Sequence, residues 1–272
     1  MKGRVLIAAG SDSGGGAGIQ ADIKAVTALG GFAATAITAL TAQNTLGVRG
    51  VVPVAPDFIR LQMRLVLEDI GADALKTGML HDAATIEAVC DEIEARAAGV
   101  PLVADPVMVA KGGHRLLESE AVEALKRRLL PLAAVLTPNL PEAEALAGVE
   151  VRDEAGMARA ADALLRSGAR AVLLKGGHLE GGRVVDLLAT PDGTERFEDA
   201  RIDTRHTHGT GCTLASAVAA GLAQGMALRD AVVRARLYVR AAIAAAPGYG
   251  EGHGPLDHGV TVDPDRVRRL GG

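Results

Sequence analysis

Short apolar runs, rich in β-branched residues, alternate with longer helical patterns over most of the chain. The predicted strands are Val5–Ala9, Ala33–Leu40, Ala74–Met79, Leu102–Ala104, Ala133–Leu136 and Ala171–Leu174. The predicted helices between them are Ile19–Leu29, Asp57–Asp69, Ala83–Ala97, Ser119–Leu130, Pro141–Leu146 and Glu154–Ser167. Such alternation is typical of βαβ units, so we expect an α/β fold with a mostly parallel, buried sheet and helices on both faces.

The pattern changes in the last third of the chain. Val184–Thr190 and Thr194–Phe197 flank the turn residues Pro191-Asp192-Gly193, which predicts a β-hairpin at the edge of the sheet. Two Ala-rich helices are then expected, over Thr210–Gln224 and Leu228–Ala245.

The C-terminal residues 247–272 show neither pattern. Pro247 to His258 is rich in Gly, Pro and His, which is typical of an irregular surface segment. No linker, low-complexity tract or internal repeat interrupts the sequence. Residues 1–272 are therefore predicted to form a single domain.

Composition narrows the classes of partner and location. The net charge of -4 comes from 29 basic and 33 acidic residues without a Lys/Arg stripe, so no nucleic-acid partner is expected. No apolar stretch reaches the roughly 18 residues of a membrane span. Cys90 and Cys212 form no CxxC pair, which favours reduced thiols and a cytoplasmic protein. With only 2% aromatic residues, a flat ligand must be held by aliphatic, Met and backbone surfaces.

Most of the unusual polar chemistry follows directly after predicted strands. These segments are Gly10–Gly18, Thr41–Asn44, Lys76–Met79, Asp105–Val107, Thr137–Asn139 and Lys175–Gly177. In an open α/β sheet, ligands bind outside the carboxyl ends of the strands. The sequence therefore predicts a ligand site along that edge of the sheet.

Several familiar motifs are incomplete. Gly16–Ala21 can be read as G-x-G-x-x-A, but Ala36–Thr41 lacks the acidic residue that a dinucleotide fold needs about 20 positions later. The dipeptide Gly-Lys occurs nowhere, so a Walker A loop is excluded. Gly10–Gly14 has Asp12 where a nucleophile elbow requires serine. His206–His208 has no third zinc ligand nearby, so we expect it to support the adjacent turn.

The best candidate for chemistry is the start of the helix predicted at Thr210. Gly209 and Gly211 allow a tight turn that exposes consecutive N–H groups at the positive end of the helix dipole. Such a nest suits a transferring phosphoryl group. An ordinary glycine-rich N-cap has the same spacing, so that alternative stays open.

Cys212 lies in the first turn of this helix, where the pKa of a thiol is expected to fall. A lowered pKa would let the thiolate accept the proton of a substrate hydroxyl. The alternative is a small buried side chain, because free cysteines are often simply buried.

Four residues at or just after predicted strands are further candidates for a phosphoryl-transfer site. Asn139 and Glu142 are expected near a Mg²⁺-nucleotide, although helix capping also explains them. Asp105, like Glu142, can hold Mg²⁺ directly or through water, or it can form a turn. Lys175 can reach a phosphate, or it is a solvated lysine. Positive charge, Mg²⁺ ligands, an anion nest and a base together predict a small-molecule kinase.

The motifs also carry a family resemblance. They are Gly10-Ser11-Asp12, Gly15–Asp22, Thr38–Thr45, Lys76–Met79, Asp105–Met108, Thr137–Ala143, Lys175–His178 and His208–Thr213. In this order, from residue 10 to about 225, the chain resembles the hydroxymethylpyrimidine/phosphomethylpyrimidine kinases of thiamine biosynthesis. The resemblance implies the three-layer α/β/α sandwich of the ribokinase-like superfamily. It departs at Ser13-Gly14, where the family more often has Pro-Ser.

The resemblance implies a role for each matching residue. The implied catalytic residues are Cys212, Gly209, Thr210, Gly211 and Lys175, with Cys212 where sugar kinases carry an aspartate base. The implied substrate contacts are Gln43, Asp22, Met79, Gly10 and Val107. The implied ATP contacts are Asp105, Asn139, Glu142 and Lys175. An amide such as Gln43 offers an acceptor and donors that complement an aminopyrimidine edge, and a Met sulfur packs on flat rings.

The resemblance further implies ATP- and Mg²⁺-dependent phosphorylation of 4-amino-5-hydroxymethyl-2-methylpyrimidine, then of its monophosphate to the pyrophosphate, by a homodimer. A pyridoxal or pyridoxine kinase of the same superfamily is the near alternative, because pyridoxal also carries a hydroxymethyl group on a flat ring. Gln43 favours the pyrimidine. A pyrimidine-binding protein without catalysis is the other alternative, and the joint presence of Cys212, Lys175, Asp105 and Glu142 argues against it.

Overall fold

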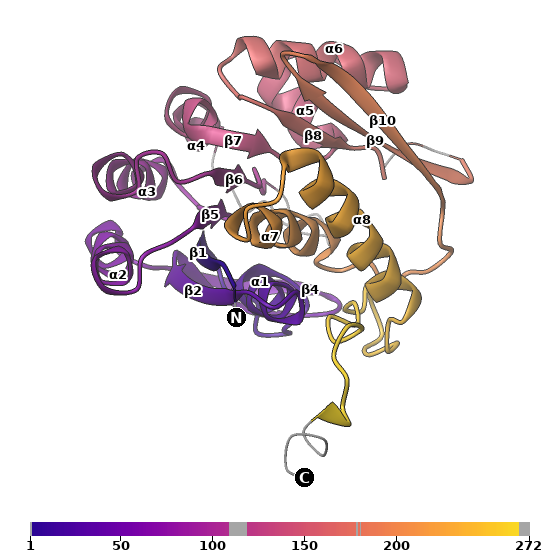
Figure 1. The fold of residues 1–272 in the computed structure, drawn as a ribbon, viewed down its shortest axis with the longest axis horizontal. Helices are drawn as coiled ribbons and strands as arrows, with labels where there is room; N and C mark the ends of the chain where they lie inside the picture. Colours follow the sequence, from indigo (N-terminus) through magenta and orange to yellow (C-terminus); the bar gives the residue numbers. More distant parts are fainter. Residues whose placement is uncertain (1, 109–118, 178, 180, 267–272) are drawn as a thin grey trace.

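A computed structural model describes residues 2–108, 119–177, 179 and 181–266. Within these residues, eight strands form one sheet in the order β10-β9-β8-β7-β6-β5-β1-β2 (Figure 1). Their bounds are β1 Arg4–Ala9, β2 Phe32–Ile37, β5 Ala74–Thr77, β6 Leu102–Ala104, β7 Ala133–Leu136, β8 Val172–Lys175, β9 Arg183–Thr190 and β10 Gly193–Ala200. Neighbours from β2 to β8 pair in parallel, whereas β9 and β10 are antiparallel at the edge. The parallel sheet and the edge hairpin are confirmed.

Helices cover both faces of this sheet, giving three layers (Figure 1). One layer holds α1 Gly18–Ala28, α7 Thr210–Ala223 and α8 Leu228–Ala244. The other holds α2 Pro56–Asp69, α3 Ala83–Arg96, α4 Ser119–Ala124, α5 Leu140–Ala147 and α6 Glu154–Arg166. Within the described residues, every helix falls short of the length and hydrophobicity of a membrane span. The predicted α/β/α sandwich is confirmed.

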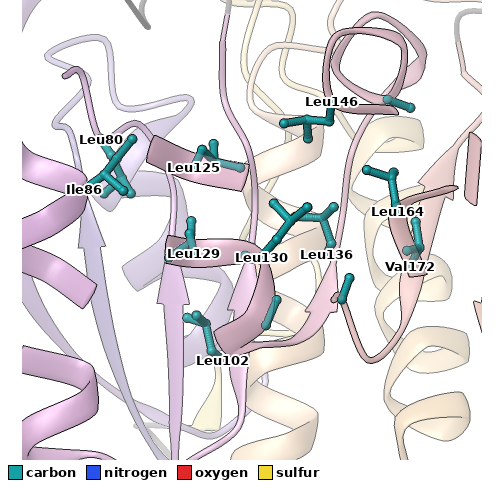
Figure 2. Close-up of a cluster of buried hydrophobic side chains, with 14 of the residues drawn as sticks. Leu80, Ile86, Leu102, Leu125, Leu129, Leu130, Leu136, Leu146, Leu164 and Val172 are labelled. Atoms are coloured by element: carbon teal, nitrogen blue, oxygen red, sulfur yellow. The ribbon is translucent and has the colours of Figure 1, made fainter. Parts of the chain in front are cut away.

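Alternate residues of β1 supply the two apolar cores. Val5, Ile7 and Ala9 face the α1/α7/α8 layer, while Leu6 and Ala8 face the other layer. Figure 2 shows part of the larger core, in which leucines from both the sheet and the covering helices meet. A strand buried on both faces reads as a continuous apolar run, which is why the sequence identified it.

The predicted strand Ala33–Leu40 is wrong in extent. β2 ends at Ile37, and the chain continues into β3 Ala39–Asn44, which pairs with β4 Gly47–Pro53 in a separate two-stranded antiparallel sheet. Thr38 marks the break, because it is fully buried and its Oγ1 donates to the Met79 carbonyl at 2.6 Å. The end of β2 and the first two residues of β3 lie within one mostly apolar stretch, so composition alone did not separate them.

The predicted helix Ser119–Leu130 is regular only as far as Ala124. A π-helical turn over Leu125–Leu129 and a 3₁₀ turn over Leu130–Leu132 follow. Pro131 lacks an N–H group and cannot continue an α-helix. The irregular turns still bury Leu125, Leu129 and Leu130 against the sheet (Figure 2).

The segment from Pro247 to His258 is irregular, as predicted, but it is not merely a surface segment. The His253 N–H donates to the Thr45 carbonyl at 3.0 Å, and the His208 N–H donates to the Gly254 carbonyl at 3.1 Å. Leu256 and His258 are buried. The segment thereby joins the β3–β4 turn to the start of α7. Residues 267–272 of the predicted irregular tail, and His178 of the Lys175 motif, lie outside the described residues.

Candidate active site

Helix α7 begins against the glycine loop that follows β1. Its N-cap, Gly209, has a φ of +79°, a left-handed conformation that favours glycine. A Cβ at this position would collide with the Gly16 carbonyl oxygen. The first N–H groups of a helix have no partner within the helix. The glycine turn and the N-terminus of α7 therefore lie at the positions predicted from the sequence.

Lys175, at the end of β8, lies between the start of α7 and a buried carboxylate. Its Nζ is 3.0 Å from Oδ1 of Asp105, which follows β6, and Thr137 Oγ1 donates to the same oxygen at 3.2 Å. A Cβ at Gly211 would lie 3.1 Å from Lys175 Nζ. Burial acts to lower the pKa of Lys175, but Asp105 and Glu142 outweigh it and raise that pKa. The site therefore keeps a cation beside the helix start.

Asn139 and Glu142 form a capping box at the start of α5. The Asn139 N–H donates to Glu142 Oε2 at 2.9 Å, and the Glu142 N–H donates to Asn139 Oδ1 at 3.0 Å. Burial raises the pKa of Glu142 to about 7, with Lys175 opposing and Asp105 adding to the rise. The capping alternative is thus correct, yet Glu142 also lies within electrostatic reach of the Lys175–Asp105 pair.

Cys212 is half-buried in the first turn of α7. Burial raises the pKa of its thiol to about 12, Lys76 opposes the rise, and Asp22 and Asp105 add to it. The prediction of a lowered pKa is wrong for the substrate-free protein, because burial and two carboxylates outweigh the helix dipole. Cys212 is a neutral thiol in this state.

Asp22, one of the predicted substrate contacts, forms a buried ion pair. It is fully buried, and its two oxygens lie 3.0 and 2.9 Å from Lys76 Nζ, which is fully buried too. Ser216 Oγ donates to Asp22 Oδ1 at 2.7 Å. Burial acts to lower the pKa of Lys76, but Asp22, Cys212 and Asp105 raise it overall. This ion pair therefore places a positive charge close to Cys212.

Gly10, Met79 and Val107 meet around the first residue of β3. Met79 and Ala39 form a small buried apolar cluster, with Val51 and Val107 packed against it. A Cβ at Gly10 would lie 3.1 Å from Met79 Sδ, so glycine lets the Met79 side chain approach the backbone closely. The structure thus brings three of the five predicted substrate contacts together on an apolar surface.

Gln43, further along β3, lies between the loop after β1 and the start of α7. Its backbone N–H donates to Ser13 Oγ at 2.9 Å, and that hydroxyl donates to the Gln43 carbonyl at 2.9 Å. Its side-chain amide lies 3.2 Å from His208 Nε2 at one end and 3.2 Å from Thr41 Oγ1 at the other. The amide is therefore held from two sides.

Two groups stand in the sequence motifs but were assigned no role from the sequence. Lys76 lies in an apolar strand, and a buried lysine requires an acidic partner, so the charge itself was the available signal. Asp12 closes the glycine loop, because it accepts hydrogen bonds from three backbone N–H groups and contacts His208 Nε2 at 2.8 Å. An aspartate followed by glycines is typical of a side chain that binds nearby backbone N–H groups.

Two surface hollows lie apart from this cluster. One, of about 250 Å³, lies beside α6 and the β9–β10 hairpin, and is lined by Glu154, Val185 and Arg196 among others. The other, of about 350 Å³, lies beside Pro101, Ala134 and Arg170, which precede or begin β6, β7 and β8. Neither hollow is lined by a predicted site residue, so the site is defined by the chemistry at the carboxyl ends of the strands.

Solved structures of vitamin kinases share this fold. The pyridoxal kinase of Bacillus subtilis, in an ADP complex, has a TM-score of 0.89 and 38% identity, covering 96% of this chain and 98% of its own. The phosphomethylpyrimidine kinase of Clostridium difficile has a TM-score of 0.78 and 39% identity, covering 88% of this chain and 98% of its own. These similarities define the class: a ribokinase-like kinase.

The sequence comparisons narrow the class to one family. A model of the family described as phosphomethylpyrimidine kinase matches residues 12–257. The hydroxymethylpyrimidine/phosphomethylpyrimidine kinase of Rhizobium meliloti is 51% identical over 256 residues, 93% of this chain and 96% of the relative. The thiamine biosynthesis bifunctional protein ThiED of Geobacter sulfurreducens is 53% identical over 98% of this chain, which spans 54% of that longer protein. The chain belongs to the phosphomethylpyrimidine kinase family and is a phosphotransferase, which confirms the resemblance.

Proposed function

We propose that this protein transfers a phosphoryl group from ATP to the hydroxymethyl group of 4-amino-5-hydroxymethyl-2-methylpyrimidine, and a second one to the resulting monophosphate. The observation that carries the proposal is the Lys175–Asp105 pair, which lies against Gly211 in the first turn of α7. A cation beside an open helix N-terminus suits a phosphoryl group in transfer. The relatives that are 51–53% identical carry this activity, or thiamine biosynthesis, in their names.

ATP is the proposed phosphoryl donor. Solved structures with the same fold include pyridoxal kinases in complex with ADP and with AMP-PCP, at 38% and 34% identity. In the proposed mechanism, the N–H groups of Gly211 and Cys212 stabilise the transferring phosphoryl group and Lys175 neutralises the oxygens of the leaving nucleotide. The Cys212 thiol orients the substrate hydroxyl, and Lys76 supplies the positive charge that favours a thiolate if the thiol takes the proton.

The carboxylates beside Lys175 suit Mg²⁺ held partly through water. Among the described residues, no three His, Cys, Asp or Glu side chains group as a metal site. Asp105 and Glu142 are two carboxylates, of which Asp105 Oδ1 already accepts from Lys175 and Thr137. Mg²⁺ commonly binds one or two carboxylates, several waters and substrate phosphates, so this donor set fits. Bound there, Mg²⁺ would supply charge neutralisation at the phosphates.

The substrate is tested by steady-state kinetics with two alcohols. ADP release measures the rate with each alcohol. We expect kcat/KM for the aminopyrimidine alcohol to be at least about 100-fold above that for pyridoxal, since several polar contacts distinguish the rings. A higher kcat/KM with pyridoxal would contradict the proposed substrate and favour the pyridoxal kinase. ADP release with neither alcohol would favour a binding protein.

The homodimer and the cytoplasmic location stay predictions. Light scattering on the purified protein tests the first, with an expected mass of twice 27.8 kDa. Cell fractionation tests the second.

A further inference from the structure

Three segments that are distant in sequence meet at the amide of Gln43. Asp12 comes from the loop after β1, Gln43 from β3, and His208 from the residue before the α7 N-cap. His208 Nε2 lies 2.8 Å from Asp12 Oδ2 and 3.2 Å from the Gln43 amide. Both side chains are well buried, with 12% of His208 and 3% of Asp12 exposed. A Cβ at Gly16 would collide with the His208 ring, so glycine lets the ring lie close against the backbone there.

The protons of this cluster can be assigned by chemistry. Asp12 accepts hydrogen bonds from the N–H groups of Gly14, Gly16 and Ala17. Burial acts to raise the pKa of Asp12, but His208 and the N–H groups of Ala17 and Gly14 outweigh it, so the pKa is lowered and the group is a carboxylate. An anion at 2.8 Å requires His208 Nε2 to carry its proton. A protonated ring nitrogen cannot accept a hydrogen bond, so the end of the Gln43 amide that faces it must be the oxygen, which shares the single Nε2 proton with Asp12.

The other end of the amide gives the same assignment. The Thr41 hydroxyl has one proton, and it lies 2.9 Å from the Ser11 carbonyl, which can only accept. The hydroxyl oxygen is then free to accept from Gln43, 3.2 Å away. Amide oxygen and nitrogen are assigned from such networks, and only one orientation satisfies both ends. In that orientation, the oxygen faces His208 and the nitrogen faces Thr41, which reverses the amide as placed in the structure, where Nε2 faces His208 and Oε1 faces Thr41.

We propose that His208, held by Asp12, is a positioning residue that fixes the orientation of the Gln43 amide and thereby selects a substrate ring with adjacent amine and ring nitrogen. The inference rests on the proposed function. His208 and Thr41 use one acceptor site and one donor of the amide, which leaves one acceptor site and one N–H. A ring with an amine beside a ring nitrogen matches these two in one register only. A rotated amide would set donor against donor.

The first part of the proposal is tested without any substrate. Nitrogen-15 NMR of the histidine rings, with His208 assigned from the signals missing in His208→Gln, reports which ring nitrogen carries a proton. We expect a proton on Nε2 of His208. A bare Nε2 would overturn the proposal, whatever the protein phosphorylates.

Ring selection is tested by comparing kcat/KM for the aminopyrimidine alcohol with kcat/KM for the same pyrimidine lacking the 4-amino group. His208→Met removes the N–H at similar bulk, while the amide nitrogen of His208→Gln replaces Nε2–H. We expect His208→Met to reduce the preference for the amino compound about tenfold, the equivalent of about one hydrogen bond. His208→Gln should keep the preference within about threefold. Circular dichroism of both variants confirms that they fold.

The outcomes separate the two claims. An unchanged preference in His208→Met, or an equal loss for both compounds in both variants, would overturn the positioning role and leave the proposed function intact. Failure of the wild-type protein to phosphorylate the aminopyrimidine alcohol would overturn the proposed function and, with it, the selection of the ring. If His208→Met does not fold, the test rests on His208→Gln and the NMR result. A wild-type Nε2 proton together with a changed kcat/KM preference for the amino compound in His208→Gln would then contradict the proposal.

Discussion

Lys175 Nζ lies 3.0 Å from Asp105 Oδ1, at the point where β8 and β6 end, and the Asp105 side chain is only 2% exposed. The two residues are 70 positions apart in sequence, and the parallel sheet brings them together beside Gly211. A cation held by a buried carboxylate is fixed in place before any phosphate arrives. Preorganised charge of this kind is a major source of catalytic rate.

Replacing Lys175 tests that charge. We expect Lys175→Met to lower kcat by about 100-fold or more, because the leaving oxygens lose their neutralising cation. The KM for the pyrimidine should change by less than about threefold. Lys126→Met is the matched control, since Lys126 pairs with the exposed Glu123 on the surface. A Lys175→Met enzyme with wild-type kcat would contradict the assigned role.

The thiols should be unreactive in the substrate-free protein. Burial raises the pKa of both Cys212 and Cys90 to about 12, so few thiolates exist at pH 8. We expect iodoacetamide to modify both cysteines more slowly than free cysteine, as followed by intact mass. Rapid modification of Cys212 at pH 8 would mean that its pKa is low after all.

Removing one partner of the buried Lys76–Asp22 pair should cost more stability than removing both. Lys76→Met leaves the Asp22 carboxylate without its cation, and we expect a loss of about 3–5 kcal/mol in the free energy of unfolding. The double variant Lys76→Met with Asp22→Leu should recover much of that loss, since neither charge remains buried. Urea unfolding measures both. A double variant as unstable as the sum of the two single variants would contradict this account.

The stability of the protein should depend on pH through Glu142. Burial raises the pKa of Glu142 from 4.5 to about 7, so the folded protein binds more protons than the unfolded chain between these values. Its contribution to stability is fully present below about pH 4.5 and is lost as the pH rises towards 7. Gln at this position keeps a capping box and has no charge.

We therefore expect the free energy of unfolding of Glu142→Gln to rise relative to that of the wild type as the pH increases from 5 to 8, by at most about 3 kcal/mol. Urea unfolding at the two pH values gives the difference. Glu144→Gln, on the same helix but outside the Lys175 cluster, is the control. A stability difference between Glu142→Gln and the wild type that stays constant with pH, or that shifts towards the wild type as the pH rises, would argue against a raised pKa of Glu142.

The sheet could be predicted from the sequence because its strands are buried on both faces and read as apolar runs. β3 could not be separated from β2, since the break at Thr38 depends on a contact with the Met79 carbonyl 41 positions away. β4 was missed because its residues are mostly exposed and it contains Gly47 and Gly50. Its pairing with β3 is a tertiary feature.

The site shows a similar division. The glycine turn at Gly209 and the strand-end residues Asp105 and Lys175 were recognisable because local chemistry and strand polarity place them. The direction of the Cys212 pKa shift was not, because it depends on burial and on Asp22 and Asp105, which only the fold brings close. The Asp12–His208 contact spans 196 positions and left no local pattern beyond the glycines after Asp12.

Mass spectrometry of the products tests the central claim most directly. The wild-type protein and Cys212→Ala are each incubated with ATP, Mg²⁺ and 4-amino-5-hydroxymethyl-2-methylpyrimidine. We predict that the wild type forms the monophosphate and then the pyrophosphate, while Cys212→Ala still binds the pyrimidine in calorimetry and forms neither product. No phosphorylated pyrimidine from the wild type would contradict a phosphoryl-transfer site at the start of α7, and equal yields from the two proteins would contradict the role of the Cys212 thiol in it.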